Sequence, residues 1–288
     1  MKTLQKRAIS VAAVALLSGL ACSSAFAADT PADPEDAGSP IAANVSVVSD
    51  YRYRGISQSG LKPAIQGGFD YAHESGFYIG NWNSSISWIS DGATPVPNNK
   101  VTAPIEMDFY GGIKKELIGE GFASDLGVLQ YYYPSSGIAV QGTQANPNTT
   151  ELYVAQNFTF GAVTGFAKFS YAVSPLFGFA NSTGSYYPDL TVNYDTGVWG
   201  LAVNAHVGYQ YVAGNVQGSR PQVTNSSLYS YTDWKLGLTK DFGGGLSLAA
   251  AYIGTNAAKS STGTYNYASP TGKNLGGSTG VVTLTKTF

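Results

Sequence analysis

Charged residues are scarce in this chain. Asp, Glu, Lys and Arg make up 12% of its 288 residues, whereas about 25% is usual for a soluble domain. The formal net charge of −2 argues against a nucleic-acid-binding protein that works through a basic face. A single cysteine, Cys22, excludes a disulfide-stapled scaffold. After the N-terminal region, no apolar run approaches the roughly 18 residues of a transmembrane helix, so the sequence predicts no helical membrane protein.

The first 27 residues have the layout of a secretory signal peptide. Basic residues come first, an apolar stretch follows over 11–21, and Ala25-Phe26-Ala27 fits the small-x-small cleavage rule. We expect cleavage between Ala27 and Ala28, which would remove the only cysteine. An alternative makes Cys22 a lipid-modified first residue.

Residues 28–40 contain three Pro, four acidic residues and no aromatic residue. Such a composition cannot bury enough apolar surface to offset the entropy of ordering the chain. We therefore expect a flexible periplasmic segment here, followed by one folded domain over 41–288.

From residue 41 onward the dominant period of hydrophobicity is two, which is the period of a β-strand with one apolar and one polar face. In the first such stretch, Val45, Val47, Tyr51 and Tyr53 share one face, while Asp50, Arg52 and Arg54 share the other. Several of the predicted strands are about 10–12 residues long, close to the roughly 9–11 residues that a tilted strand needs to cross a bilayer. The pattern predicts twelve strands, at 43–54, 64–73, 77–88, 104–116, 122–133, 149–158, 162–172, 186–195, 198–211, 230–241, 246–256 and 278–288.

The connections between these strands alternate between short and long. Outer-membrane barrels have short periplasmic turns and longer extracellular loops, and this sorting would put both ends of the domain on the short-turn side. The predicted fold class is all-β: a closed antiparallel transmembrane β-barrel of about 12 strands. Its partner would be outer-membrane lipid, and its location the bacterial outer membrane.

Aromatic residues gather near the predicted strand ends. Tyr and Trp favour membrane interfaces, where the ring is in apolar surroundings and the polar tip meets water. We therefore expect interfacial girdles that include Tyr78, Tyr110, Tyr131 and Tyr133. The chain ends on Phe288, and a terminal aromatic strand of this kind is expected to engage the barrel-assembly machinery.

Several segments resemble the TorF family of exported bacterial barrel proteins, which are classed as porins. The most specific is Ser49-Asp-Tyr-Arg-Tyr-Arg-Gly55, supported by Glu106-Met-Asp-Phe-Tyr110, Tyr231-Thr-Asp-Trp-Lys235 and Val281 to Phe288. The resemblance covers about residues 41–288. It implies an outer-membrane β-barrel with a pore role.

Motifs for catalysis or cofactor binding are missing from the predicted mature chain, and we expect no cofactor. With no Cys and only His73 and His206, a tetrahedral Cys/His zinc site cannot form. His73 beside Ser75 leaves open a lipid hydrolase at the membrane rim, although a solvated turn histidine is the simpler interpretation. His206 is expected inside the barrel in a hydrogen-bond network.

Charged residues on the predicted inward face are candidates for lining a pore: Asp50, Arg52, Arg54, Glu106, Asp108, Lys114, Asp125, Glu151, Asp233 and Lys235. Glu106 and Asp108 share one face, so they could bind a divalent cation or form ion pairs with neighbouring strands. The tight turn at 117–121 sets Lys114 opposite or diagonal to Asp125, which predicts an ion pair.

With Asp70 and Lys168 added, seven inward acids stand against five inward bases, which predicts a mild preference for cations. Arg52 and Arg54 should face an acid-only group across a constriction near the outer mouth. Alternatively, these two arginines pair with Asp50 and Asp233 across the seam of the barrel.

The function predicted from these patterns is a non-enzymatic, porin-like channel that passes small polar solutes or ions. Two alternatives remain open. One is a barrel lipid hydrolase that uses His73 or His206, and the other is a non-conducting barrel that displays its long loops.

Overall fold

The structure is a computed structural model that describes residues 40–93, 97, 99–138, 146–260 and 263–288. The predicted signal peptide, its cleavage site between Ala27 and Ala28, and segment 28–39 lie outside the described residues.

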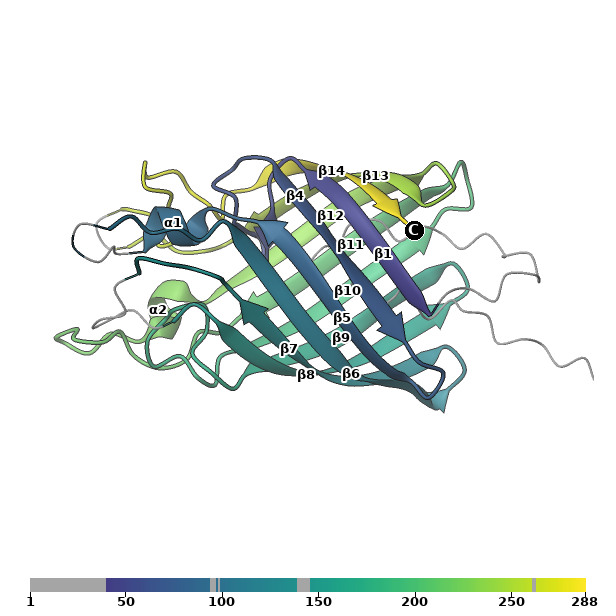
Figure 1. The fold of residues 1–288 in the computed structure, drawn as a ribbon, viewed down its shortest axis with the longest axis horizontal. Coiled ribbons are helices and arrows are strands. Elements are labelled where there is room, and N and C mark those ends of the chain that lie inside the picture. The colour runs from purple at the N-terminus through teal and green to yellow at the C-terminus, as the bar shows by residue number, and fades with distance from the viewer. Residues whose placement is uncertain (1–39, 94–96, 98, 139–145, 261–262) are drawn as a thin grey trace, which may run out of the picture.

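Twelve antiparallel strands close into a barrel, as the period-two pattern predicts (Figure 1). Each strand pairs with its neighbours in the chain, and the register Val48↔Thr283 joins the first strand to the last. The strands are β1 (Ile41–Val48), β4 (Ala64–Ala72), β5 (Phe77–Ser85), β6 (Ile105–Gly119), β7 (Phe122–Tyr132), β8 (Thr149–Phe160), β9 (Val163–Ala172), β10 (Tyr186–Asp195), β11 (Leu201–Gln210), β12 (Tyr231–Asp241), β13 (Leu246–Thr255) and β14 (Thr279–Thr287).

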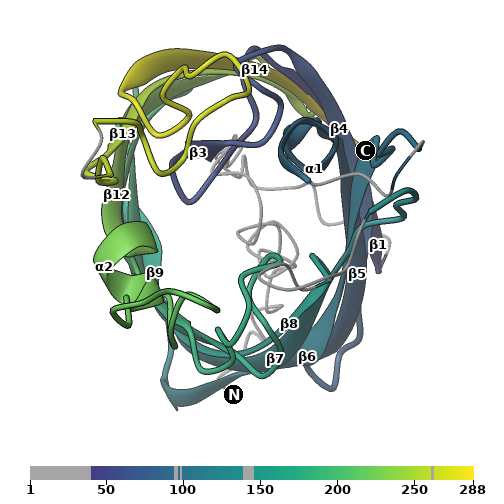
Figure 2. The ribbon, with the colours of Figure 1, turned by 90° about the vertical axis from the view of Figure 1, so that its left-hand side faces the viewer.

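The first strand is shorter than predicted: β1 ends at Val48 rather than at residue 54. Residues 49–63, which we call the inner loop, leave the wall and fold into the lumen. They carry the two-stranded sheet of β2 (Arg52–Tyr53) and β3 (Ile56–Ser57). Figure 2, seen from the long-loop end, shows β3 inside the ring of strands.

Tyr51 and Tyr53 were predicted to share the outward apolar face of the first strand, and this prediction is wrong. Tyr51 is 1% exposed, and Tyr53 packs against Tyr131 and Phe177 with ring centroids 5.6 Å apart in each case. Both tyrosines are drawn inward because the inner loop carries them past the end of the paired wall.

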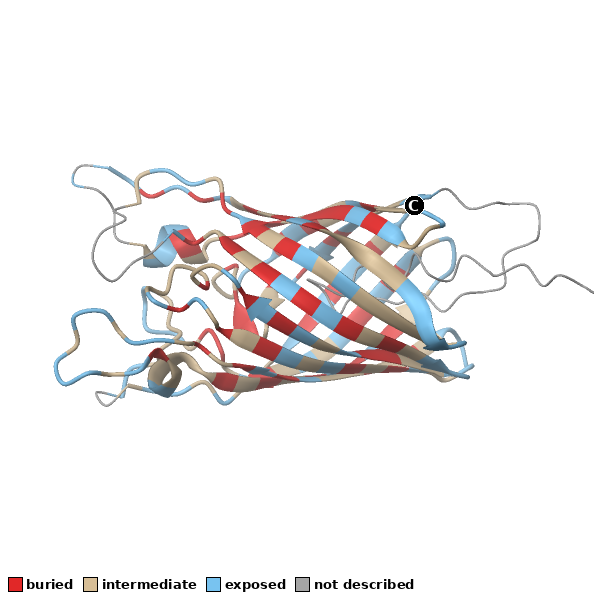
Figure 3. Cartoon of the chain, turned by 90° about the horizontal axis from the view of Figure 1, so that it is seen from below, coloured by how far each residue is buried: buried red, intermediate tan, exposed pale blue. Residues whose placement is uncertain are grey.

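The two faces of the wall differ sharply in chemistry, and burial alternates over much of the wall (Figure 3). Outward positions carry exposed aliphatic side chains such as Leu126 (61%), Val154 (53%) and Leu236 (58%). Inward positions carry buried polar groups, including Gln66, Asn204 and Thr239. In a water-soluble barrel this arrangement would be inverted, because apolar side chains leave water for the core. No helix in the described part of the chain is long and apolar enough to span a membrane.

Several aromatic residues predicted for interfacial girdles instead fill the lumen. Tyr78, Tyr110, Tyr131 and Tyr133 are each at most 6% exposed. These side chains find room because inward glycines lie beside inward tyrosines on neighbouring strands: a Cβ at Gly208 of β11 would collide with the ring of Tyr187. The high content of tyrosine and glycine is thus largely a property of the barrel interior.

Connections sort by length as predicted (Figure 1). The turns at 73–76, 120–121, 161–162, 196–200 and 242–245 are short and lie at one end, which we call the short-turn end. The inner loop lies at the other end, the long-loop end, together with the described residues of the connections at 86–104, 133–148, 173–185, 211–230 and 256–278. Two one-turn helices in these loops, α1 (Trp88–Gly92) and α2 (Asn225–Tyr229), were not predicted.

Candidate functional site

The inner loop folds around the carboxylate of Asp50, which is 6% exposed. Asp50 accepts hydrogen bonds from Arg52 Nε at 2.8 Å and from Ser57 Oγ at 2.5 Å. These bonds join the two sides of the turn to one carboxylate. Arg52 also donates to the carbonyl of Gly277 at 2.7 Å, which ties the inner loop to the connection before β14. The pairing of Arg52 with Asp50, which we gave as an alternative, is present, but it lies within the inner loop and does not cross the seam.

At the tip of this loop, Arg54 and Gly55 have positive φ angles of 46° and 77°. Such angles are strained for arginine and easy for glycine. A Cβ at Gly55 would come within 2.8 Å of the Cβ of Asp233, so only glycine fits between the loop and the wall. This tight turn directs Arg54 away from β1 and across the lumen.

Arg54 meets the far wall of the barrel. Its Nη2 donates to Glu151 of β8 at 2.7 Å, and its Nη1 donates to Gln210 of β11 at 2.6 Å. The guanidinium carbon lies 4.2 Å from the ring centroid of Tyr187 and 4.9 Å from that of Tyr53. Because the strand order puts β8 almost opposite β1, the inner loop and Arg54 together bridge the lumen.

Glu106, Asp108 and Glu151 are buried carboxylates on β6 and β8, at most 2% exposed. Glu106 accepts hydrogen bonds from the hydroxyls of Tyr51 at 2.5 Å and Tyr133 at 2.7 Å. Tyrosine hydroxyls thus take the place of the ion pairs that we expected for Glu106. No group of three or more His, Cys, Asp or Glu side chains that could hold a metal ion occurs among the described residues.

Lys114 of β6 and Asp125 of β7 are directly opposite in the strand register, as predicted. The expected ion pair is not formed, since Asp125 instead accepts a hydrogen bond from Tyr78 at 2.7 Å. The ammonium of Lys114 is buried and has no hydrogen-bond partner among the described residues. Lys168 was also predicted to face inward, and its Nζ lies 5.5 Å from the ring centroid of Tyr153.

His206 is held between two carboxylates in the hydrogen-bond network predicted for it. Its Nδ1 lies 3.0 Å from Asp189 and its Nε2 lies 2.9 Å from Asp233. Asp189 is missing from our candidate residues, although the alternation of Tyr187, Asp189 and Thr191 along β10 would have identified it. Lys235 is the next inward-facing residue after Asp233 along β12, and it is 6% exposed.

His73 lies in the exposed turn between β4 and β5, where its Nδ1 is 2.7 Å from Ser75 Oγ. The serine backbone amide also donates to this ring nitrogen at 3.2 Å. These contacts are those of a histidine that caps a tight turn. Since Ser75 is two residues away in the same turn, the contact follows from local geometry.

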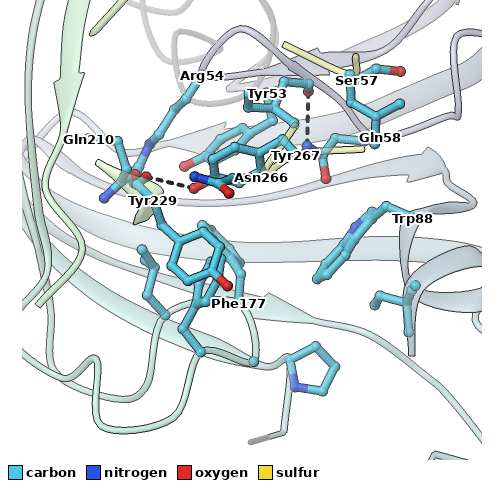
Figure 4. A pocket seen from close by; sticks show the side chains of 18 of the residues that line it. Tyr53, Arg54, Ser57, Gln58, Trp88, Phe177, Gln210, Tyr229, Asn266 and Tyr267 are labelled. Atoms are coloured by element: carbon cyan, nitrogen blue, oxygen red, sulfur yellow. Dashed lines mark hydrogen bonds between the residues drawn. The ribbon is translucent and has the colours of Figure 1, made fainter. Parts of the chain in front are cut away.

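A vestibule of about 590 Å³ opens above Arg54 at the long-loop end. Aromatic rings form much of its wall, and Arg54 and Gln210 lie at its floor (Figure 4). Tyr229 and Tyr267 are both in this wall, and the hydroxyl of Tyr267 donates to the carbonyl of Tyr229 at 2.7 Å. Burial raises the pKa of Tyr267, so its hydroxyl stays protonated and neutral.

All ten charged residues predicted to line a pore have side chains inside the barrel or in the inner loop, and their grouping agrees with the prediction in part. The arginines were expected to face an acid-only group or to pair across the seam. Arg54 lies against Glu151 of that acid-only group across the lumen, as expected, and it does not pair with Asp233. Arg52 instead pairs with Asp50 within the inner loop. The polar residues that sequence reasoning missed are Asp189, Tyr187 and Gln210.

Comparison with solved structures supports the fold. A KdgM porin aligns with a TM-score of 0.50 at 6% identity, over 86% of this chain and 99% of that one. A NanC porin aligns with a TM-score of 0.49 at 10% identity, over 86% and 98% of the two chains. The toluene transporter TodX of Pseudomonas putida gives 0.47 at 10% identity, over 86% and 88%. The similarity to the KdgM porin, at 6% identity, shows a shared barrel architecture.

No curated protein sequence matches the chain. The TorF name suggested by the sequence motifs is not confirmed, whereas the porin-like barrel fold implied by that resemblance is shown. A family model described as "Bacterial protein of unknown function (Gcw_chp)" matches residues 32–288. This chain therefore belongs to the Gcw_chp family of bacterial proteins.

Proposed function

We propose that the protein is a porin-like channel of the bacterial outer membrane for passive passage of small polar solutes or ions. One observation carries the proposal: a closed wall of twelve strands is apolar on the outside and polar and charged on the inside. A closed barrel satisfies every backbone hydrogen bond in the wall, which is what the hydrocarbon of a bilayer requires. The polar interior offers a route for solutes that the lipid excludes.

The proposed pore is narrow. Eight-stranded barrels fill with their own side chains, and barrels of 16–18 strands leave an aqueous channel. In a twelve-stranded barrel bridged by the inner loop, passing solutes must move beside Arg54 or displace it. The proposed lining keeps the ten charged residues predicted from the sequence and adds Asp189, so acids still exceed bases and the weak preference for cations stands.

Orientation and assembly follow from the same proposal. The long-loop end would face the outside and the short-turn end the periplasm, as in other outer-membrane barrels. Phe288 follows the final strand and is 72% exposed, so it remains accessible as an assembly signal. Exposed aliphatic side chains on the outer face would contact lipid.

The test is conductance in planar lipid bilayers, with the full-length mature protein refolded from inclusion bodies. Discrete channels whose conductance rises with salt concentration are expected. A barrel that folds, inserts and never conducts would contradict the proposal and favour a non-conducting barrel that displays its loops.

A further inference from the structure

Three buried acids form one cluster on the wall that faces the inner loop. Asp108 of β6 lies opposite Tyr131 of β7 in the register, and Glu151 of β8 lies opposite Leu129, so a single strand separates the two acids. Glu106 is two residues before Asp108 on the same inward face. We call Glu106, Asp108 and Glu151 the acidic wall.

Two carboxylate oxygens of the acidic wall are buried without a hydrogen-bond partner among the described residues: Asp108 Oδ1 and Glu151 Oε1. Asp108 and Glu151 are 2% and 1% exposed. Nearly all buried polar atoms in proteins are paired, so unpaired ones point to a missing partner. A carboxylate oxygen can only accept a hydrogen bond when ionised, hence the missing partner is a donor and most favourably a cation.

Arg54 shows which kind of cation the wall can hold. Glu151 and Gln210 accept from the two Nη atoms of its guanidinium, and the ring of Tyr187 lies below the guanidinium carbon at 4.2 Å. The site offers two hydrogen-bond acceptors to the two Nη atoms and an aromatic face to the plane of the group. This arrangement suits a flat guanidinium better than a compact ammonium. All three of these partners belong to wall strands, and only the guanidinium comes from the inner loop.

We propose that the wall site formed by Glu151, Gln210 and Tyr187, with Asp108 beside it, recognises small solutes that carry a guanidinium group. Arg54 occupies this site as an internal competitor when no solute is present. The inference rests on the proposed channel function, because such a solute would be a substrate of that channel. Displacing Arg54 would also free the inner loop from the far wall.

The vestibule provides a suitable approach to this site. Its floor includes Arg54 and Gln210, and Arg54 is the one formally charged residue among the described residues that line it. Aromatic side chains such as Phe177 and Tyr229 offer ring faces to a planar cation on its way down (Figure 4). An anionic solute at the same floor would have to replace Glu151 on Arg54 and lie close to Asp108, where like charges repel at low dielectric.

Binding can be measured without any current through the pore. We would titrate the folded full-length barrel in detergent micelles with ethylguanidinium chloride, at constant ionic strength, by isothermal titration calorimetry. The parent is expected to bind weakly, because a tethered Arg54 competes at a high effective concentration. Arg54→Ala should tighten binding about tenfold or more, since it removes that competitor. Adding Glu151→Gln to that variant should abolish the gain.

Matched controls separate this idea from general loosening of the lumen. Lys62→Ala removes an exposed basic side chain of the same inner loop and should leave ethylguanidinium binding at the parent level. N-ethylurea, which is nearly the same shape but neutral, should not bind to any variant. If the alanine variant fails to fold, Arg54→Gln replaces it under the same criteria.

The inference is overturned if a folded variant without Arg54 binds ethylguanidinium no more tightly than the parent, or if it gains affinity for sodium acetate instead. Failure of the proposed channel function has a different signature. If the barrel binds ethylguanidinium as expected but never conducts in bilayers, the inferred binding site is supported and the proposed channel function is contradicted.

Discussion

A single arginine placed on the outer face should distinguish a membrane barrel from a water-soluble one. Val154 lies midway along β8, is 53% exposed, and is flanked in the register by Leu126 and Phe169. At a bilayer midplane, arginine in place of an apolar side chain destabilises a barrel by about 2–4 kcal/mol. This corresponds to a change of about 30-fold to 900-fold in the unfolding equilibrium. On a surface facing water, the effect would be within about 0.5 kcal/mol.

Val198 provides the matched control. It is the same residue type and is 52% exposed, but it lies in the short turn between β10 and β11. Arginine near the interface is expected to destabilise by only about 0–1 kcal/mol. Both variants would be refolded into phosphatidylcholine vesicles and unfolded with guanidinium chloride while tryptophan fluorescence is followed. Equal destabilisation by Val154→Arg and Val198→Arg would refute the assignment of the outer face to lipid.

Further predictions concern the lumen and the loops. Arg54→Ala should raise single-channel conductance, because it removes the group that bridges the lumen to Glu151; it should also lower stability by about 3–5 kcal/mol, since it leaves a buried charge unpaired, and thermal unfolding followed by circular dichroism measures that loss. Gly55→Val should displace the inner loop, because its Cβ would collide with the wall and its φ is 77°, and faster entry of solutes into liposomes would show this; uptake at the parent rate would count against the inner loop as the constriction. The double variant Glu106→Gln with Asp108→Asn should shift the reversal potential in a salt gradient toward anion selectivity, and an unmoved potential would mean that these acids do not act on permeating ions. Protease added to intact cells should cut the connection at 211–230 and spare the turn at 242–245; the opposite pattern would invert the orientation.

The barrel was predictable from the sequence because each wall strand repeats one simple pattern. Alternation of apolar and polar residues fixed the strand number, and loop lengths fixed which strand ends lie together. The pattern failed at residues 49–54, where Tyr51 and Tyr53 continue the alternation although the paired strand β1 has already ended at Val48. There Asp50 bonds locally to Arg52 and Ser57, and such side-chain contacts compete with strand pairing.

The chemistry of the lumen was predictable only in part. The alternation of inward and outward side chains along each strand placed Glu106, Asp108 and Glu151 inside the barrel. The same rule would have found Asp189. We assigned Tyr78 and Tyr131 to interfacial girdles because they lie near strand ends. Their positions in the alternation along the strand place both side chains inside the barrel. The sequence predicted that Arg54 faces the acids of β6 and β8 across the lumen. It did not predict the direct contact with Glu151, because that contact depends on how far the closed wall curves and on the turn at Gly55.

Closure of the barrel also has a consequence for the order in which the molecule is assembled. The amide of Val282 donates to Ser49 Oγ across 233 residues of sequence, and Arg52 reaches the carbonyl of Gly277 across 225. Contacts of such range form late, since the entropy of closing the chain must be overcome first. Until β14 arrives, β1 and β13 have open edges that can recruit other chains. Because the inner loop is anchored to the segment before that same strand, sealing the wall and constricting the lumen belong to one final step.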